Sequence, residues 1–199
     1  MKKYNIPFSP PDITEEEINE VVDTLKSGWI TTGPKTKELE KRLSEYTTTP
    51  KTVCLNSATA ALELVLRVLG IGKGDEVIVP ALTYTASCSV IYHVGAKAVM
   101  VDIQTDNAEM DYSKLADAIT PRTKAVIPVD LAGIPCDYDK IFEVVESKKE
   151  LFEANSIYQE KLGRVAVIAD GAHALGSEYK GLKIGAVADF TTFSFHAVK

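Results

Sequence analysis

Two charged residues stand directly after apolar segments, where a ligand would meet them. Lys199 follows a segment whose Phe190, Phe193 and Phe195 are typical of an interior strand, and Asp170 ends the apolar run RVAVIAD. Desolvation beside aromatic rings lowers the pKa of an ammonium group and frees the amine as a nucleophile. A carboxylate at a strand end can bind a cation or a protonated ring nitrogen. The plain alternatives are a solvated lysine and an aspartate that caps the next turn.

The segment NSATAAL has the composition of an anion-binding helix start. Ser57 and Thr59 come where a predicted strand ending at Leu55 gives way to a helix. Backbone N–H groups, hydroxyls and the positive end of the helix dipole would all face a phosphate there. Serine is also a preferred N-cap, so an ordinary helix cap is the competing interpretation.

Two more side chains are expected near the same edge. Tyr84 follows the strand-like EVIVP and would lay its ring on a flat ligand, although a single tyrosine is more often a core residue. His173 lies in the turn DGAHALG, where a ligand contact and a structural hydrogen bond are both open. A phosphate cradle, a ring, a carboxylate and a lysine together meet the needs of pyridoxal phosphate. The sequence therefore predicts a site for this cofactor.

The elements that must bring these residues together alternate between two periodicities. Helical stretches separate the β-branched runs TVCL, EVIVP, KAVMVD, KAVIPV and RVAVIAD. Such alternation predicts a layered α/β domain with a largely parallel sheet, which binds ligands at the carboxyl ends of its strands. Before it, Thr14 and Glu17 form a capping box for a helix over residues 14–26, and Gly33 and Pro34 introduce a second helix.

Composition argues against several classes of protein. The net charge of −6 and the scattered 22 lysines and arginines argue against nucleic-acid binding. No run approaches the ~20 apolar residues of a membrane span, and the N-terminus lacks the apolar core of a secretion signal, so a cytoplasmic protein is expected. Cys54, Cys88 and Cys136 form no metal-ligand pattern and are expected to be reduced core residues; no metal site is predicted.

The glycines of GIGKGD look at first like a dinucleotide-binding loop. They follow a helical stretch and precede the strand EVIVP, whereas the dinucleotide fingerprint follows a strand and precedes a helix. A helix C-cap and turn is the better interpretation. A nicotinamide-dependent oxidoreductase is therefore disfavoured.

Five segments resemble the DegT/DnrJ/StrS sugar aminotransferases in order and approximate spacing: SGWITTGP, NSATAAL, GDEVIVPALTYTAS, IADGAHALGSEYKG and FSFHAVK. The resemblance covers nearly the whole chain and is greatest to the branch acting on the 4-keto group of UDP-linked sugars. It implies the large domain of a fold type I pyridoxal phosphate enzyme, a three-layer α/β/α fold with a mostly parallel sheet. Because family members are longer, it also implies an N-terminal portion. Residues 1–50 would be a helical segment with an active-site loop, and residues 51–199 part of the cofactor-binding domain.

The resemblance also assigns roles by position. Lys199 takes the place of the Schiff-base lysine that shuttles the substrate proton, and Asp170 that of the partner of the ring nitrogen. The other matching positions are the phosphate ligands Ser57, Thr59, Ala60 and Ser194, the stacking Tyr84, His173 near the cofactor 3′-oxygen, His196 beside the lysine, and the loop from Trp29 to Gly33 near the active site.

The implied reaction is a ping-pong transamination. An amino donor, expected to be glutamate, loads the cofactor, and a nucleotide-linked keto sugar then receives the amine, for surface polysaccharide or glycan synthesis. The resemblance implies a homodimer in the full-length form. A dehydratase of the same family is an alternative, but those known for deoxygenation replace the lysine with histidine, so Lys199 favours transamination. A non-catalytic regulatory or binding relative, or an inactive fragment, is the other alternative.

Overall fold

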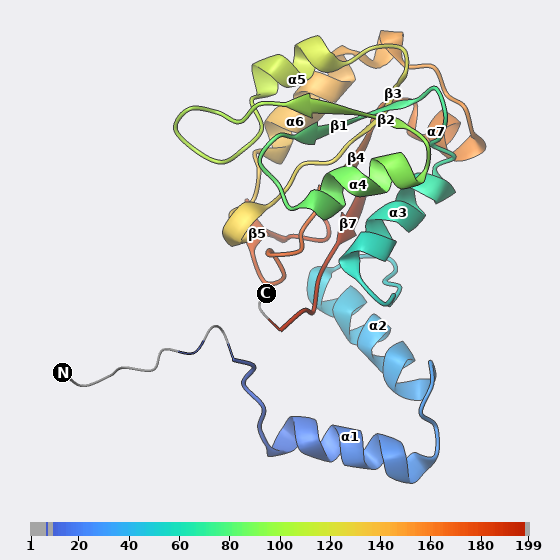
Figure 1. The fold of residues 1–199 in the computed structure, drawn as a ribbon, viewed down its shortest axis with the longest axis vertical. Helices are drawn as coiled ribbons and strands as arrows, with labels where there is room; N and C mark the ends of the chain where they lie inside the picture. The colour runs from blue at the N-terminus through green and yellow to red at the C-terminus, as the bar shows by residue number, and fades with distance from the viewer. Residues whose placement is uncertain (1–6, 8–9, 198–199) are drawn as a thin grey trace, which may run out of the picture.

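A twisted, parallel five-stranded sheet forms the centre of the protein (Figure 1). The computed structural model describes residue 7 and residues 10–197. The strand order is β2-β1-β3-β4-β7, and each neighbouring pair is parallel. The strands are β1 (Glu76–Pro80), β2 (Lys97–Val101), β3 (Thr123–Val126), β4 (Ala166–Asp170) and β7 (Phe190–Thr192). Between β4 and β7 the chain forms an antiparallel hairpin of β5 (Glu178–Tyr179) and β6 (Leu182–Lys183).

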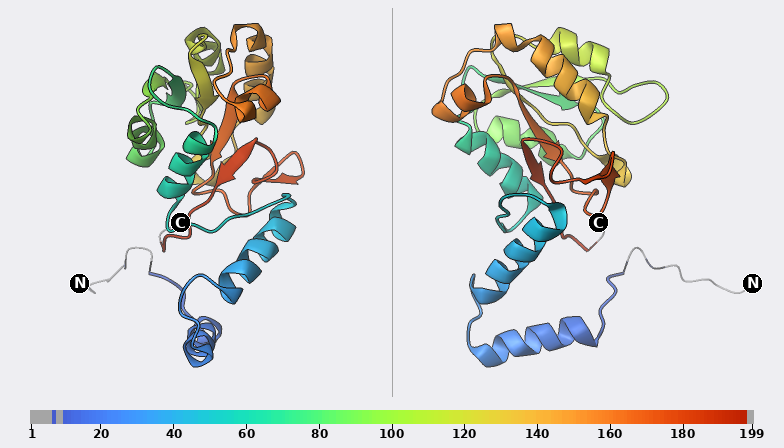
Figure 2. Two further views of the ribbon diagram at one scale, coloured as in Figure 1. Left: turned by 90° about the vertical axis from the view of Figure 1, so that its right-hand side faces the viewer. Right: turned by 180° about the vertical axis from the view of Figure 1, so that it is seen from behind.

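Helices cover both faces of the sheet (Figure 2). Three helices precede the first strand: α1 (Glu15–Ser27), α2 (Pro34–Thr47) and α3 (Ala58–Val68). The later helices are α4 (Thr85–His93), α5 (Tyr112–Ala118), α6 (Tyr138–Ser147) and α7 (Ile157–Leu162), with 3-10 turns η1 (Leu131–Gly133) and η2 (Lys149–Leu151). In the described part of the chain, no helix has the length and apolar character needed to cross a bilayer.

Alternate residues of each strand pack on opposite faces of the sheet. In β1, Val77 and Val79 join the core formed with α3 and α4, whereas Ile78 joins the core formed with α5 and α6. In β4, Ile168 joins the core with α3 and α4, and Val167 joins the core with α5 and α6. Each such side chain, fully buried, stabilises the fold by roughly 1.5–3 kcal/mol. The predicted three-layer α/β/α fold with a mostly parallel sheet is confirmed.

The first helix lies apart from the sheet (Figures 1 and 2). Its predicted capping box is present, because the Thr14 side chain accepts from N–H groups of the first turn and the Glu17 carboxylate accepts from the Thr14 N–H at 2.6 Å. The helix ends at Gly28, whose φ of 74° suits glycine. No residue of α1 is buried, and Ile18, Val21 and Leu25 on its apolar face are largely exposed in the described chain.

Two strand predictions need correction. The structure places no strand at residues 52–55; the Cys54 N–H instead donates to the Glu40 carboxylate at 2.8 Å. A β-branched run becomes a strand only when another strand pairs with it, and β7, at the sheet edge, pairs in the described residues only with β4. The second correction concerns the aromatic segment from Phe190 to Phe195, which was expected to be one interior strand. The strand β7 ends at Thr192, and Phe195 is 64% exposed.

The GIGKGD segment is a helix end and turn, as predicted, with Gly70 and Gly74 at positive φ.

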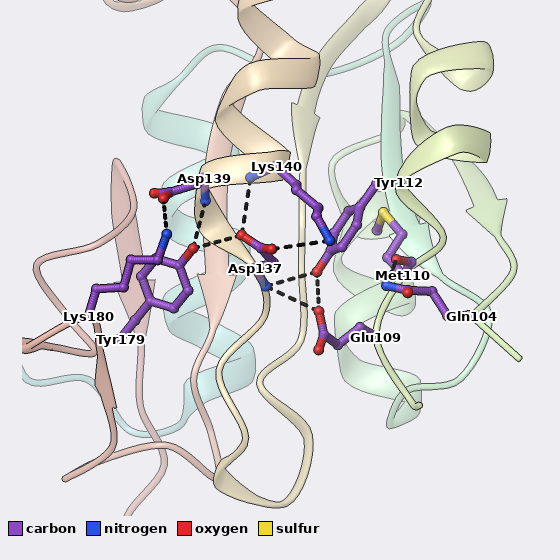
Figure 3. A network of polar contacts seen from close by, with 9 residues as sticks. All are labelled: Gln104, Glu109, Met110, Tyr112, Asp137, Asp139, Lys140, Tyr179 and Lys180. Atoms are coloured by element: carbon purple, nitrogen blue, oxygen red, sulfur yellow. Dashed lines mark hydrogen bonds and ion pairs between the residues drawn. The ribbon is translucent and has the colours of Figure 1, made fainter. Parts of the chain in front are cut away.

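A polar network fastens the hairpin to the start of α6 (Figure 3). The Tyr179 hydroxyl donates to Asp137 Oδ1 at 2.7 Å and accepts from the Asp139 N–H at 3.2 Å. On the other side, the Tyr112 hydroxyl accepts from the Asp137 N–H at 2.8 Å and donates to the Glu109 carboxylate. The hairpin is thus anchored to the start of α6, which is itself bonded to Tyr112 of α5.

Candidate active site

Asp170 is the last residue of β4 and lies at the carboxyl edge of the sheet. It is 6% exposed. Its Oδ2 accepts from the Ser87 hydroxyl at 2.6 Å, and its Oδ1 accepts from the Ala172 N–H at 3.2 Å. In the described part of the chain, no lysine or arginine pairs with this carboxylate. A buried carboxylate held by neutral donors retains its need for a positive partner.

The donor Ser87 comes from α4, which begins immediately after the loop that follows β1. Ser87 is fully buried, and its hydroxyl also lies 2.7 Å from the hydroxyl of Thr83 in that loop. Thr83, Ser87 and Asp170 thus form a chain of hydrogen bonds from the β1–α4 connection to the end of β4. Ser87 was not predicted from the sequence, because nothing in its local pattern distinguishes it from a small core residue.

A second buried carboxylate, Asp130, follows the extension of β3 and lies beside Asp170. The two residues are joined by a hydrogen bond from the Asp130 N–H to the Asp170 carbonyl at 3.1 Å. The Asp130 carboxylate accepts from the Cys136 N–H at 2.9 Å and from the Tyr138 hydroxyl at 2.8 Å. Burial raises the pKa of Asp130 to about 6, and the Asp170 charge adds to this while both hydrogen bonds oppose it.

Asp130 was not among the predicted site residues, although its position in the sequence indicates such a role. The residue directly follows the apolar run KAVIPV, and this is the same strand-end rule that pointed to Asp170. Because neighbouring parallel strands end at one edge, the rule predicts that both carboxyl groups lie close together. The structure therefore adds a titratable group to the edge that was predicted to bind a cofactor.

His173 lies in the turn after Asp170, and its ring meets the η1 turn. Nδ1 accepts from the Ala132 N–H at 3.2 Å, so this nitrogen carries no proton in that arrangement. Ala132 has an unusual φ of 56°, followed by Gly133 at 79°, and this left-handed pair directs the N–H toward the histidine. His173 thus makes a hydrogen bond within the fold, and its contact with a cofactor oxygen stays a prediction.

The helix start predicted to bind phosphate is the N-terminus of α3. Ser57 is the N-cap, and its hydroxyl accepts from the Ala60 N–H at 3.1 Å. The ordinary cap is therefore present, and the phosphate roles of Ser57, Thr59 and Ala60 stay predictions. Ser194, just beyond β7, accepts from the His196 N–H at 3.2 Å through its hydroxyl. The start of α3 and the end of β7 lie on the same lower side of the sheet in Figure 1.

Of the remaining predicted residues, one lies at the sheet edge, one lies in the loop after α1 and one lies outside the described residues. Tyr84 is the N-cap residue of α4 and is 74% exposed, so it is not the core residue that its type favours. Trp29 follows α1, and its indole N–H donates to the Thr32 carbonyl at 3.1 Å. Lys199 lies outside the described residues, so its predicted role as the nucleophile is not tested by the structure.

These residues fit pyridoxal phosphate by the chemistry of their donors and acceptors. A buried carboxylate without a basic side chain suits a protonated ring nitrogen, and the start of an 11-residue helix suits a phosphate. Residues 11–199 match the DegT/DnrJ/EryC1/StrS aminotransferase family. The chain belongs to this family. Its place in the family confirms the resemblance seen in the sequence, and its members use pyridoxal phosphate.

Known relatives agree with this assignment. The chain is 44% identical over 199 residues to the UDP-4-amino-4-deoxy-L-arabinose–oxoglutarate aminotransferase of Shewanella sediminis, covering 100% of this chain and 47% of the relative. It is 41% identical over 198 residues to the spore coat polysaccharide biosynthesis protein SpsC of Bacillus subtilis, again covering 100% and 47%. The chain thus spans about half the length of the curated relatives it matches.

Solved structures extend the likeness to three dimensions. The chain is 72% identical to the putative sugar aminotransferase Spr1654 of Streptococcus pneumoniae, and the two structures superpose with a TM-score of 0.97. Its pyridoxamine phosphate form matches 98% of this chain and 49% of the relative, and its pyridoxal phosphate form matches 98% and 50%. Both cofactor forms are those of a transaminase. The cofactor predicted from the sequence is thus confirmed for this group of proteins.

Proposed function

We propose that the full-length protein containing this chain is a pyridoxal phosphate-dependent aminotransferase that moves an amino group, from glutamate, to the keto group of a nucleotide-linked sugar. The observation that carries the proposal is the buried Asp170 carboxylate, held by neutral donors at the carboxyl edge of a parallel sheet. The substrate class is supported by relatives named for an aminoarabinose aminotransferase and for spore coat polysaccharide synthesis. Surface polysaccharide or glycan synthesis is the proposed pathway.

The cofactor would be held from three sides. The first turn of α3, with Ser57, Thr59 and Ala60, would bind the phosphate through N–H groups and hydroxyls, joined by the Ser194 hydroxyl beyond β7. Asp170 would keep the proton on the ring nitrogen. These groups belong to different elements, so the parallel sheet is what brings them to one edge.

The chemistry divides between the cofactor and the chain. When bound, pyridoxal phosphate supplies an electron sink for bond breaking at the substrate carbon. Lys199 would then move the proton between that substrate carbon and the C4′ carbon of the cofactor, the shift that transamination requires. Tyr84 would cover one face of the ring, and His173, with Nδ1 occupied by the Ala132 N–H, would present its other nitrogen to the cofactor oxygen. In each case the residue orients a group or moves a proton.

We further propose a cytoplasmic homodimer, with residues 1–50 forming a helical segment and active-site loop and residues 51–199 forming part of the cofactor domain. The apolar face of α1 supports an additional contact, since Ile18, Val21 and Leu25 are 45%, 60% and 63% exposed. A helix whose apolar stripe faces solvent normally packs on another surface. Trp29, at the end of that helix, is 56% exposed in the loop assigned to the active site.

The test uses the full-length protein. Titration with pyridoxal phosphate should give a visible absorbance band, and borohydride reduction followed by peptide mass mapping should place the cofactor on Lys199. A Lys199→Ala variant is the control and should lose the band. A UDP-linked 4-keto sugar supplied with ¹⁵N-glutamate should gain ¹⁵N by mass spectrometry. Loss of a sugar hydroxyl without nitrogen gain would instead indicate the dehydratase, and absence of any band would contradict both.

A further inference from the structure

The carboxylate of Asp170 is fixed by two donors that lie on different elements. Oδ1 accepts from the Ala172 N–H at 3.2 Å, within the turn that follows β4. Oδ2 accepts at 2.6 Å from Ser87, 83 residues earlier in the chain, on α4. Two donors on two oxygens define both the position and the plane of the group, whereas one donor would leave it free to rotate.

The direction of each hydrogen bond in the Thr83–Ser87–Asp170 chain follows from proton counting. A hydroxyl has one proton, and the Ser87 proton is given to the Asp170 carboxylate, which can only accept when ionised. In the hydrogen bond of 2.7 Å between the Thr83 and Ser87 hydroxyls, Thr83 must therefore be the donor and Ser87 the acceptor. A hydroxyl that accepts one bond becomes a better donor of its own, so Thr83 strengthens the bond from Ser87 to Asp170.

The local chemistry of α4 offers Ser87 another partner that it does not use. Serines within helices commonly turn back to a carbonyl of the preceding turn. Ser89, two residues later on the same helix, does this, with its hydroxyl 3.3 Å from the Ala86 carbonyl. Ser87 is fully buried and points at Asp170 across the layer boundary between α4 and β4. The two serines thus form a natural pair, one directed to the predicted site and one not.

We propose that Ser87, backed by Thr83, is a positioning residue that aligns the Asp170 carboxylate with the ring nitrogen of pyridoxal phosphate. The inference rests on the proposed function, because it assigns the alignment to that cofactor. A charge-assisted hydrogen bond between neutral donor and carboxylate depends on geometry, and a carboxylate that rotates away from the ring would bind the nitrogen proton less well. In this proposal Ser87 acts through Asp170 and not by direct contact with the cofactor.

The experiment compares three variants of the full-length protein. Ser87→Ala removes the donor to Asp170, Thr83→Val removes the donor to Ser87 with little change of shape, and Ser89→Ala is the matched control on the same helix. The readouts are the dissociation constant for pyridoxal phosphate, the pH dependence of the bound cofactor spectrum, which reports the charge of the ring, and thermal unfolding of the cofactor-free protein. Loss of a hydrogen bond to a charged group predicts about tenfold weaker binding for Ser87→Ala.

The expected order of effects on cofactor affinity and spectrum is Ser87→Ala, then Thr83→Val, with Ser89→Ala equal to wild type. If Ser87 only satisfies a buried hydroxyl, its variant would lower the unfolding temperature while affinity and spectrum stay within twofold of wild type, and the proposal would be wrong. If Ser87→Ala does not fold, an unchanged spectrum and affinity in Thr83→Val would overturn it equally. Wild-type protein that binds no cofactor would contradict the proposed function instead, so the two failures are distinguishable.

Discussion

Arg164 and Asp189 form a bidentate ion pair that joins the segment before β4 to the segment before β7. Nη1 lies 2.8 Å from Oδ2 and Nη2 lies 2.9 Å from Oδ1, and the side chains are 14% and 13% exposed. Asp189 also accepts from the Val167 N–H of β4 at 2.8 Å. The Asp189 carboxylate therefore pairs with Arg164 and also accepts a backbone hydrogen bond from β4, where β4 meets the edge strand β7.

We predict that Asp189→Ala lowers the free energy of unfolding by about 3 kcal/mol, because it leaves a largely buried guanidinium with only the more exposed Glu146 as counter-ion and the Val167 N–H without its acceptor. Urea denaturation of the full-length protein measures the loss. Lys35→Ala is the control, since Lys35 pairs with Glu20 and Asp23 on the exposed surface. Equal effects of the two substitutions would contradict the structural role given to the buried pair.

Asp130 predicts a pH dependence of stability. Its pKa in the folded protein is about 6, against an unfolded value of about 3.9, because burial and the Asp170 charge disfavour the ionised form. The folded protein thus binds this proton more tightly, so the stability that Asp130 contributes is fully present below pH ~4 and is lost as the pH rises through about 6. The facing groups are Cys136, Tyr138 and Asp170.

The substitution Asp130→Asn removes this titration while keeping the shape of the side chain. We expect the unfolding free energy of wild type, measured relative to Asp130→Asn, to fall by about 2 kcal/mol between pH 4 and pH 7, which is most of the effect of a shift of roughly two pKa units. Urea denaturation at several pH values gives this difference directly. A difference that does not change with pH, or that rises with it, would contradict the assignment.

The sequence predicted the sheet and its edge better than it predicted the contacts at that edge. Period-two and helical patterns depend on burial, so they identified β1, β2, β3 and β4, and the strand-end rule then located Asp170. Ser87 was missed because its contact with Asp170 depends on how α4 packs on the sheet, across 83 residues of chain. Residues 52–55 have strand-like composition but no ladder in the described chain, since pairing depends on a partner rather than on composition.

The network in Figure 3 predicts that Tyr179→Phe loosens the β5–β6 hairpin. The change deletes the bond of 2.7 Å to Asp137 and the acceptor for the Asp139 N–H, and it should cost about 1 kcal/mol of unfolding free energy. Hydrogen exchange should become faster at residues 177–184 in particular. Tyr158→Phe, on α7 and outside the network, should leave exchange in the hairpin unchanged; equal protection in both variants would show that the network does not hold it.

The negative charge of Asp170 can be removed with little change of shape. Asp170→Asn keeps nearly the same shape and can still accept one of the two present hydrogen bonds, so the protein should fold with a loss of only about 1 kcal/mol. It cannot supply the negative charge that a protonated ring nitrogen requires. We therefore expect kcat/KM for glutamate to fall by at least about a hundredfold, equivalent to roughly 2.7 kcal/mol of transition-state stabilisation.

Two measurements separate the loss of charge from a loss of structure. Stopped-flow absorbance of the glutamate half-reaction reports the chemistry, and urea denaturation of the same sample reports the fold. Asp106→Asn, in the exposed loop before α5, is the matched control and should behave as wild type in both. If Asp170→Asn kept its kcat/KM within fivefold of wild type, the carboxylate at the end of β4 would be a structural cap and another group would have to balance the ring nitrogen.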